Sequence, residues 1–318
     1  MTQQKKWTTA NMPNLSGKTA VVTGANSGLG YETSLALAQK GARVIMACRN
    51  QTKGQQAAGQ IRQIAPGAEL DLRPLDLADL ASVRAFSQAV QADYAQLDLL
   101  INNAGVMALP YRQTADGFEM QFGTNHLGHF ALTGLLLERL LAAPAGRVVT
   151  VSSMLHRGGQ MNFDDLQGQQ TYNKRAAYGQ SKLANLLFAY ELQRRLTAVS
   201  ANIISVAAHP GYAATNLQDA GPAMENSAVQ RQMMRLANKV MAQSQAMGAL
   251  PSLYAATAVD VHGGDFIGPD GFGGMRGYPT RVQSSERSHD LATAVRLWDV
   301  SVALTNVTYA RLDVNPVK

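Results

Sequence analysis

Residues 20–30 read Ala20-Val21-Val22-Thr23-Gly24-Ala25-Asn26-Ser27-Gly28-Leu29-Gly30. The apolar, β-branched start predicts a buried strand, and a helical pattern begins around Tyr31. Glycines between a strand and a helix permit a tight turn and bring the backbone close to a pyrophosphate, which the free N–H groups of the helix start can bind. Because a second strand ends about twenty residues later, the arrangement predicts a dinucleotide site rather than a purely structural turn. The residues predicted to bind the cofactor in this turn are Gly24, Asn26, Ser27, Gly28, Leu29 and Gly30.

Apolar β-branched runs alternate with longer helical patterns, which predicts a parallel sheet with helices on both faces. We expect strands at Thr19–Thr23, Arg43–Ala47, Leu70–Pro74, Leu97–Ile101, Arg147–Ser152, Asn202–Ala207 and near Asp265–Ile267. Helical patterns lie at Leu29–Lys40, Thr52–Ile64, Leu80–Tyr94, Gly117–Leu141 and Ala176–Leu196. The predicted fold class is α/β, a single doubly wound Rossmann domain with a mainly parallel seven-stranded sheet.

The order of elements also predicts the domain organisation. No internal repeat or Pro/Ser-rich linker interrupts it, so we expect a polar tail over residues 1–15 and one domain over residues 16–318. A loop and a Met-rich helical stretch at about 211–257 are expected to cover the substrate, although helical Met spacing is more often typical of a core. Residues from about 280 to 318 are expected to form a C-terminal extension.

Composition excludes several classes of protein. The chain has 318 residues, 46% of them hydrophobic, so it can bury a substantial core. Its one cysteine, Cys48, cannot form an intramolecular disulfide, and the six histidines lack zinc-site spacing, so we expect no metal and a reducing, cytoplasmic location. His126 and His129 lie three residues apart, but we expect packing roles for them.

The charge balance and the start of the chain bear on partners. The first 16 residues are polar, and no apolar run of about 20 residues occurs, so we expect no membrane anchor. The net charge is +6, but the basic residues are dispersed, which does not favour nucleic acid. A basic excess would also suit a phosphorylated small-molecule ligand.

The turns after the second and third strands predict the adenosine end of the site. Cys48-Arg49 follows the second strand where a carboxylate would bind the ribose 2′-hydroxyl, so Arg49 favours NADP over NAD, with Lys53 assisting; a solvated loop cation is the alternative. Asp76-Leu77 follows the third strand and could contact the adenine. Asp76 could equally cap the next helix.

Candidate catalytic groups follow the fourth and fifth strands. The fourth ends at Asn102-Asn103-Ala104-Gly105, small and amide-bearing residues suited to a ribose, and Asn125 lies inside a helical pattern that its amide disfavours. Tyr178 and Lys182 are four residues apart and share a helix face, where an ammonium would lower the pKa of the phenol. A solvated Tyr/Lys pair is the alternative.

Taken together, these motifs resemble the short-chain dehydrogenase/reductase family over roughly residues 16–280. The matching motifs are Thr23-Gly24-x-x-x-Gly28-x-Gly30, Asn102-Asn103-Ala104-Gly105, Asn125, Ser152-Ser153, Tyr178-x-x-x-Lys182 and Pro210-Gly211-x-x-x-Thr215. Within the family the chain is most similar to the retinol dehydrogenase and WW-domain oxidoreductase branch, as Ala47-Cys48-Arg49 and the long interval between Ser153 and Tyr178 indicate.

The resemblance implies a role for each residue of a Ser–Tyr–Lys–Asn set. Ser153 would polarise the substrate carbonyl, with Ser152 in reserve, and Tyr178 would exchange the proton. Lys182 would hold the nicotinamide ribose, and Asn125 a water linked to solvent. Cofactor contacts are further expected from Asn103, Ala104, Gly105, Pro210 and Gly211, and from Thr215 near the carboxamide.

The implied activity is NADP(H)-dependent hydride transfer between the nicotinamide and a carbonyl or a secondary or primary alcohol, and the expected substrate is a hydrophobic ketone or aldehyde. One alternative is a non-catalytic NADP-binding sensor or interaction protein. Another is a carbon–carbon double-bond reductase of the protochlorophyllide reductase type, which the lone cysteine disfavours. The partner is thus a small-molecule carbonyl or alcohol, and a homodimer, a homotetramer and a monomer all remain open.

Overall fold

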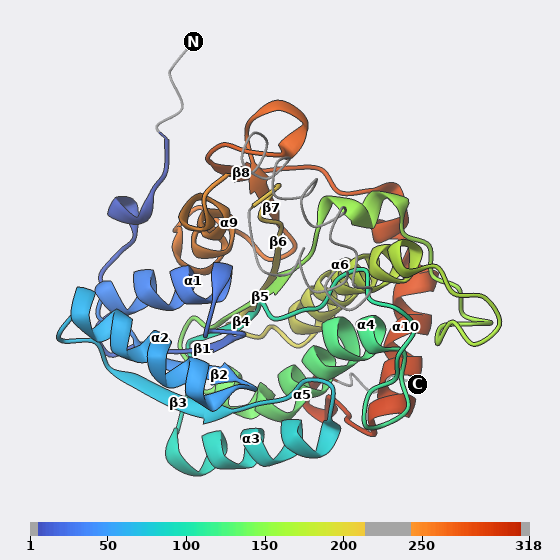
Figure 1. Ribbon diagram of the computed structural model, residues 1–318, viewed down its shortest axis with the longest axis horizontal. Coiled ribbons are helices and arrows are strands. Elements are labelled where there is room, and N and C mark those ends of the chain that lie inside the picture. The colour runs from blue at the N-terminus through green and yellow to red at the C-terminus, as the bar shows by residue number, and fades with distance from the viewer. Residues whose placement is uncertain (1–5, 214–242, 313–318) are drawn as a thin grey trace.

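The computed structural model describes residues 6–213 and 243–312. Its centre is an eight-stranded sheet in the order β3-β2-β1-β4-β5-β6-β7-β8 (Figure 1). Strands β1 to β7 are parallel, and β8 is antiparallel to β7. The strands are β1 Thr19–Thr23, β2 Arg43–Cys48, β3 Leu70–Pro74, β4 Leu99–Asn102, β5 Arg147–Val151, β6 Ile204–Ala208, β7 Phe266–Pro269 and β8 Pro279–Arg281. The α/β, mainly parallel Rossmann prediction is confirmed.

The eighth strand is the one that the sequence did not predict. It has only three residues, begins with a proline and pairs through Pro269 and Pro279 at the edge of the sheet. Proline cannot donate to a ladder, so it is tolerated at a strand start or an edge but weakens the strand pattern in the sequence. The predicted strands near the other seven positions differ from the observed ones by up to two residues at their ends.

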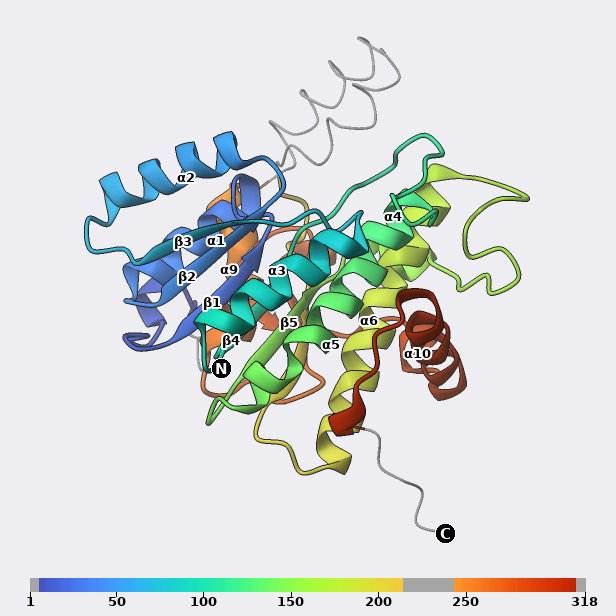
Figure 2. The same ribbon diagram turned by 90° about the horizontal axis from the view of Figure 1, so that it is seen from below.

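Helices cover both faces of the sheet, as Figure 2 shows. One face carries α1 Gly28–Gln39, α2 Gln51–Ile64 and α9 Gln245–Thr257. The other carries α3 Leu80–Asp93, α5 Gly128–Leu141 and α6 Lys174–Ala198, with α10 Leu291–Thr305 packed outside α6. Shorter elements are η1 Thr9–Asn11, α4 Met120–Phe122, η2 Gly123–Leu127, η3 Met154–Gly158, η4 Phe272–Gly274, η5 Glu286–His289 and η6 Ala310–Leu312. Because the strands are buried on both faces, they read as continuous apolar runs.

The predicted helix Gly117–Leu141 is interrupted. It consists of α4, the π-helical turn η2 and α5, so an extra residue is inserted where Asn125 lies. Such π turns are rare and often lie at functional sites. A Cβ added to Gly128 would lie 2.4 Å from the Leu77 carbonyl oxygen, so the start of α5 packs directly on the loop after β3.

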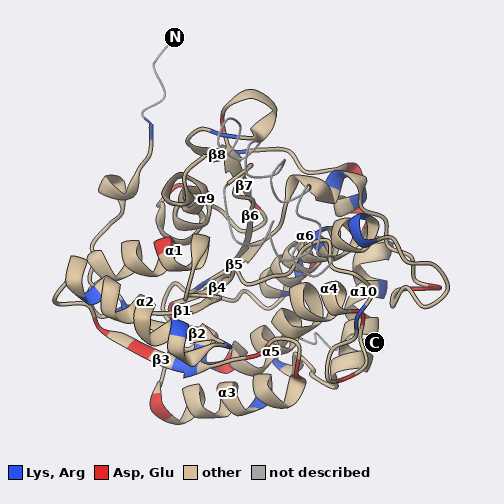
Figure 3. Ribbon diagram, in the orientation of Figure 1, with Lys and Arg blue, Asp and Glu red and all other residues tan. Residues whose placement is uncertain are grey.

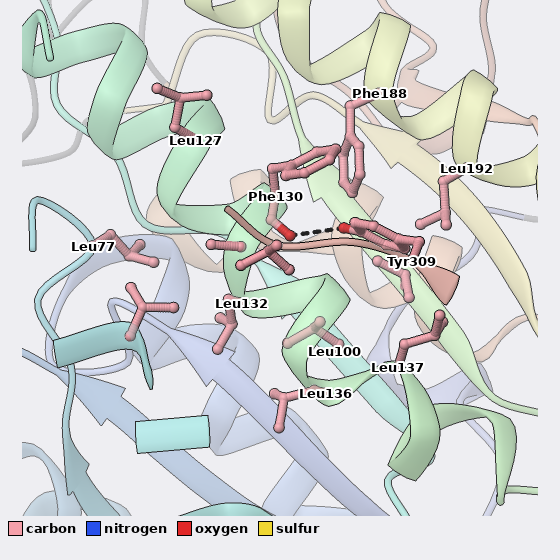
Figure 4. Close-up of a cluster of buried hydrophobic side chains, with 14 of the residues drawn as sticks. Leu77, Leu100, Leu127, Phe130, Leu132, Leu136, Leu137, Phe188, Leu192 and Tyr309 are labelled. Carbon is pink, nitrogen blue, oxygen red and sulfur yellow. Dashed lines mark hydrogen bonds between the residues drawn. The ribbon is translucent and has the colours of Figure 1, made fainter. Parts of the chain in front are cut away.

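The two ends of the described chain pack on the domain. Met12 and Leu15 are buried beneath α1, inside the stretch expected to be a polar tail. At the other end, the Tyr309 hydroxyl donates a 2.7 Å hydrogen bond to the Phe130 carbonyl oxygen (Figure 4). A Cβ on Gly134 would lie 2.7 Å from Val307, so the C-terminal segment lies directly on α5.

Helix α9 falls inside the stretch expected to cover the substrate, but it is a core helix. It packs on α1, and its Ala249, Leu250 and Leu253 are buried against the sheet. Most of the Met-rich stretch lies outside the described residues. Lys and Arg residues are distributed over α2, β3, α6 and several loops (Figure 3).

Candidate active site

A cavity of about 620 Å³ lies at the carboxyl ends of the central strands. It lies beside β1 and β4, where the strand order along the sheet reverses, which is where open α/β sheets bind ligands. The predicted residues that line it are Gly24, Asn26, Ser27, Gly28, Leu29, Gly30, Arg49, Asp76, Leu77, Asn103, Ala104, Gly105, Ser153, Tyr178, Lys182, Pro210 and Gly211. Thr215 lies outside the described residues, and Asn125 is buried behind the cavity wall.

The glycine turn has the backbone that a pyrophosphate site needs. Gly24 has φ +68° and Gly28 φ +57°, which L side chains rarely adopt. A Cβ on Gly30 would lie 2.2 Å from the Gly24 carbonyl oxygen, so only glycine lets α1 start this close to β1. Ser27, the residue before α1, makes no side-chain cap bond, which leaves the N–H groups of the helix start available to an anion. The turn therefore fits a dinucleotide.

Arg49 and Asp76 meet at the adenosine end of the cavity. Their charged groups are 3.7 Å apart, and the side chains are 73% and 33% exposed. An Asp76 carboxylate oxygen also accepts from the Ala78 N–H at 3.0 Å. The cap of α3 is Asp79, which accepts from Ala81 and Ser82, so the alternative role considered for Asp76 belongs to Asp79.

The two serines after β5 have different surroundings. The Ser152 hydroxyl is buried and donates to the Lys182 carbonyl oxygen at 2.8 Å. Both serines line the cavity, and the Ser153 side chain is the one that acts on the Tyr178 phenol, lowering its pKa. Of the pair, Ser153 is thus the serine with a hydroxyl beside the phenol.

Tyr178 and Lys182 both face the cavity from α6, but they are not directly paired. The Lys182 ammonium donates to the Val151 carbonyl oxygen at 3.0 Å and lies 5.8 Å from the centre of the Tyr178 ring. Burial raises the pKa of Tyr178 to about 12, and the neighbouring Ser153 side chain lowers it by less. Burial also lowers the pKa of Lys182 to about 8. The lowered phenol pKa expected from helix spacing is therefore absent, because burial outweighs a distant ammonium.

Asn125 is fixed on three sides within the π-helical turn. Its Oδ1 accepts from the Val106 N–H at 2.8 Å, and its Nδ2 donates to the Val106 carbonyl and to the Ser181 hydroxyl, each at 2.9 Å. A Cβ on Gly105 would lie 3.0 Å from Asn125 Oδ1 and 3.6 Å from Lys182 Nζ. Both amide N–H groups of Asn125 thus have protein acceptors, which is the geometry of a positioning residue.

Two histidines near Asn125 have structural partners. His129 Nδ1 lies 3.0 Å from the Asn125 carbonyl oxygen, and its Nε2 lies 2.9 Å from the Thr23 hydroxyl. His126 Nε2 lies 2.8 Å from the Ser301 hydroxyl of α10. Burial lowers the pKa of His126 to about 3 and that of His129 to about 4, so both are neutral at pH 7. Their packing roles are as expected.

The family model for short chain dehydrogenases matches residues 18–226. The chain belongs to this family. Retinol dehydrogenase 14 of Mus musculus is 43% identical over 303 residues, which cover 92% of this chain and 86% of that protein. Retinol dehydrogenase 11 of Homo sapiens is 43% identical over 290 residues, covering 91% and 86%. The predicted family and its retinol dehydrogenase branch are confirmed.

Solved structures share the fold of this chain. A crystal structure of an uncharacterised protein from Mycobacterium paratuberculosis has a TM-score of 0.79 at 44% identity and covers 96% of this chain and 99% of that one. A structure with bound NADP, described as an NAD(P)-dependent gluconate 5-dehydrogenase from Beutenbergia cavernae, has a TM-score of 0.62 at 26% identity, covering 80% and 95%. As a short-chain dehydrogenase with these relatives, the protein is an NAD(P)-dependent oxidoreductase that acts on alcohol or carbonyl groups.

Several cavity residues of this short-chain dehydrogenase were not predicted. They are Cys48, Met107, Thr124, Met154, Leu155 and Ala213. Each lies within three residues of a predicted site residue, so proximity in sequence is the signal that could have found them. Within the described residues, no helix is long and apolar enough to cross a membrane.

Proposed function

We propose that this protein is an NADP(H)-dependent oxidoreductase of hydrophobic ketones or aldehydes and the corresponding alcohols, with Tyr178 as its acid and base. The observation that carries this proposal is the cavity that Ser153, Tyr178 and Lys182 line together with the glycine turn, in which Ser153 acts on the pKa of the phenol. Two hydroxyls held together beside a dinucleotide turn can bind one carbonyl oxygen between them.

Each residue of the proposed site has a separate role in the reaction. When bound, the nicotinamide cofactor would supply the hydride for carbonyl reduction or accept it in alcohol oxidation. The Ser153 hydroxyl donates a hydrogen bond to the carbonyl oxygen, where negative charge develops. Tyr178 delivers the proton to that oxygen. Lys182 is close enough to the cavity to bind the ribose hydroxyls, and Asn125 positions Val106 and Ser181 behind it.

The pKa of Tyr178 determines which protonation state of the phenol is present at neutral pH. A phenol with a pKa of about 12 is protonated at neutral pH, which is the state that a proton donor needs. Carbonyl reduction uses this state directly, whereas alcohol oxidation first requires the phenolate. At neutral pH, Tyr178 is therefore in the state that can donate a proton to a carbonyl oxygen.

The cofactor is proposed to be NADP rather than NAD. Arg49 lies at the cavity edge where a 2′-phosphate would be, and its guanidinium is mostly exposed with one distant carboxylate partner, Asp76. A guanidinium matches the geometry of a phosphate through paired hydrogen bonds. The bound NADP of a structure 26% identical to this chain supports the same preference.

Substituting Tyr178→Phe tests the assignment. We expect turnover of NADPH with a panel of ketones and aldehydes to be lost, while NADPH binding, followed by nucleotide fluorescence, is retained. Tyr190→Phe is the matched control, because Tyr190 is on the same helix and its hydroxyl bonds Ser284 away from the cavity. Near-normal turnover by Tyr178→Phe would overturn the role, and tight NADPH binding without turnover by the unaltered protein would favour a sensor.

We further propose a monomer in the cytoplasm. The outer faces of α5 and α6 pack against the chain's own C-terminal segment, since Trp298 stacks on Phe188 and Tyr309 bonds Phe130. This segment takes the place that a second subunit would need on these helices. Sedimentation velocity tests the monomer, and a dimer that persists at low concentration contradicts it. The single cysteine suits a reducing compartment, which cell fractionation checks.

A further inference from the structure

A second cavity of about 380 Å³ lies next to the proposed active site, at the ends of β6 and β7. Met154, the residue after Ser153, lines both cavities. The floor is the Phe266 ring, which lies 5.1 Å from the His209 ring and 5.5 Å from the His156 ring. A ligand extending past Ser153 would therefore reach this cavity next.

His209 presents a hydrogen-bond donor to the second cavity. Its Nδ1 accepts from the Gly211 N–H at 3.2 Å, so the proton of the neutral ring is on Nε2. Nε2 has no partner among the described residues, although the side chain is only 4% exposed and lines the cavity. Because the Nε2–H has no acceptor among the described residues, it can donate a hydrogen bond to a ligand oxygen in the cavity.

The other histidine in the wall has no spare hydrogen-bonding atom. His156 Nδ1 lies 2.6 Å from the Ser153 carbonyl oxygen, and its Nε2 accepts from the Ser285 N–H at 3.1 Å. The His156 ring is thus held in place and neutral, and both of its nitrogens are occupied by protein partners. Its bond to Ser153 ties this wall to the residue proposed to polarise the carbonyl.

Arg157 brings a positive charge to the wall of the second cavity. Arg157 lines the cavity and uses one N–H on the Gln283 carbonyl oxygen at 2.7 Å. The pKa of His209 is lowered to about 4, first by burial, then by His156 and then by the charge of Arg157. The Asp270 carboxylate also lines the cavity, but it accepts from the Tyr278 N–H at 2.8 Å and is not among the causes that act on His209.

We propose that the second cavity binds the carboxylate of substrates whose carbonyl lies at Ser153 and Tyr178, so that this enzyme reduces ω-oxo carboxylic acids. Arg157 and the His209 Nε2–H bind the carboxylate, and Met154, Phe266 and Val282 contact the apolar chain between the two ends. The inference rests on the proposed function, because it places the reacting carbonyl at the same two hydroxyls.

The test compares succinic, adipic and azelaic semialdehydes with their methyl esters, using NADPH. A charge-assisted hydrogen bond to Arg157 should raise kcat/KM for the best acid about tenfold or more over its ester. Arg157→Gln should lower this acid-to-ester ratio about tenfold. Arg62→Gln is the matched control, because Arg62 also donates to a backbone carbonyl but lies on α2.

Two substitutions of His209 separate its nitrogens. In His209→Asn, the amide oxygen lies near the former Nδ1 position and can still accept from the Gly211 N–H. The donor at the Nε2 position is lost. In His209→Gln, the amide N–H lies near the former Nε2 position and can donate there, but the acceptor at the Nδ1 position is lost. We expect His209→Asn to lower the acid-to-ester ratio more than His209→Gln does.

Equal kcat/KM for acids and esters, or an unchanged ratio in Arg157→Gln, would overturn the proposal. If neither acids nor esters were turned over, the proposed function would fail, and the cavity is then tested by calorimetric titration of the NADP-bound protein with azelate. Binding that weakens about tenfold in Arg157→Gln supports the carboxylate site, and no binding overturns it.

Discussion

Replacing Arg49 tests the preference for NADP over NAD, and the exposure and contacts of Arg49 determine the expected loss of NADPH affinity. The guanidinium is 73% exposed and 3.7 Å from Asp76, and such exposed ion pairs contribute roughly 0–1 kcal/mol to stability. Arg49→Ala should therefore leave the free energy of unfolding within about 1 kcal/mol. A hydrogen bond to a charged group contributes about 1.5–3 kcal/mol, and solvent exposure favours the lower end, so NADPH affinity should fall about tenfold.

The assay is titration of the protein with NADPH and with NADH, followed by nucleotide fluorescence. Arg49→Ala should weaken NADPH while leaving NADH nearly unchanged, and Arg49→Glu should weaken NADPH further by repulsion. Asp76→Asn removes the carboxylate that competes for the guanidinium and should tighten NADPH. Arg62→Ala is the control, because Arg62 is an exposed cation in α2 that does not line the cavity. Equal weakening of both nucleotides by Arg49→Ala would refute the 2′-phosphate role.

Three other outcomes follow from the same geometry. Gly30→Ala puts a Cβ 2.2 Å from a carbonyl oxygen, so it should lower Tm and abolish NADPH binding, whereas Gly59→Ala, with open space around it, should raise stability slightly; similar effects of the two would contradict the close packing. His126 and His129 are neutral when folded and protonate near pH 6.5 when unfolded, so stability in urea titrations should fall as pH drops from 6.5 towards 4, by about 3 kcal/mol for His129. A flat pH dependence would show that these rings are not buried neutral. Lys182 has a pKa of about 8, so kcat/KM for reduction should decline as pH rises through 8, and Lys182→Arg should remove that inflection.

The main features of the fold could be predicted because local patterns and tertiary packing agree. β1, buried along its whole length, reads as an apolar run, and the glycines at 24 and 30 are needed by contacts that the sequence pattern implies. The π turn at Asn125 could not be located, since its cause is long-range: Asn125 bonds Val106 and Ser181, which are far away in sequence. The poor fit of an interior Asn to a helix was the only local sign of it.

The sequence predicted which residues line the site better than it predicted their hydrogen bonds and pKa values. Spacing along one helix brings Tyr178 and Lys182 to the same cavity, but it does not determine which atoms they bond. Lys182 bonds the Val151 carbonyl, a contact between a helix and a strand end that no local pattern contains. The expectation that Lys182 would lower the phenol pKa therefore failed for a reason of tertiary geometry.

Burial at Tyr178 has two opposite consequences for the chemistry. Removal of water strengthens the hydrogen bonds that Ser153 and Tyr178 can give to a carbonyl oxygen, because the local dielectric constant is low. The same burial raises the pKa of Tyr178 to about 12 and lowers that of Lys182 to about 8, so it disfavours the phenolate and the ammonium alike. Reduction benefits from the first effect and tolerates the second, because its proton donor is the neutral phenol. Oxidation needs Tyr178 as the phenolate, so the rate of the alcohol reaction should rise with pH more steeply than that of the carbonyl reaction.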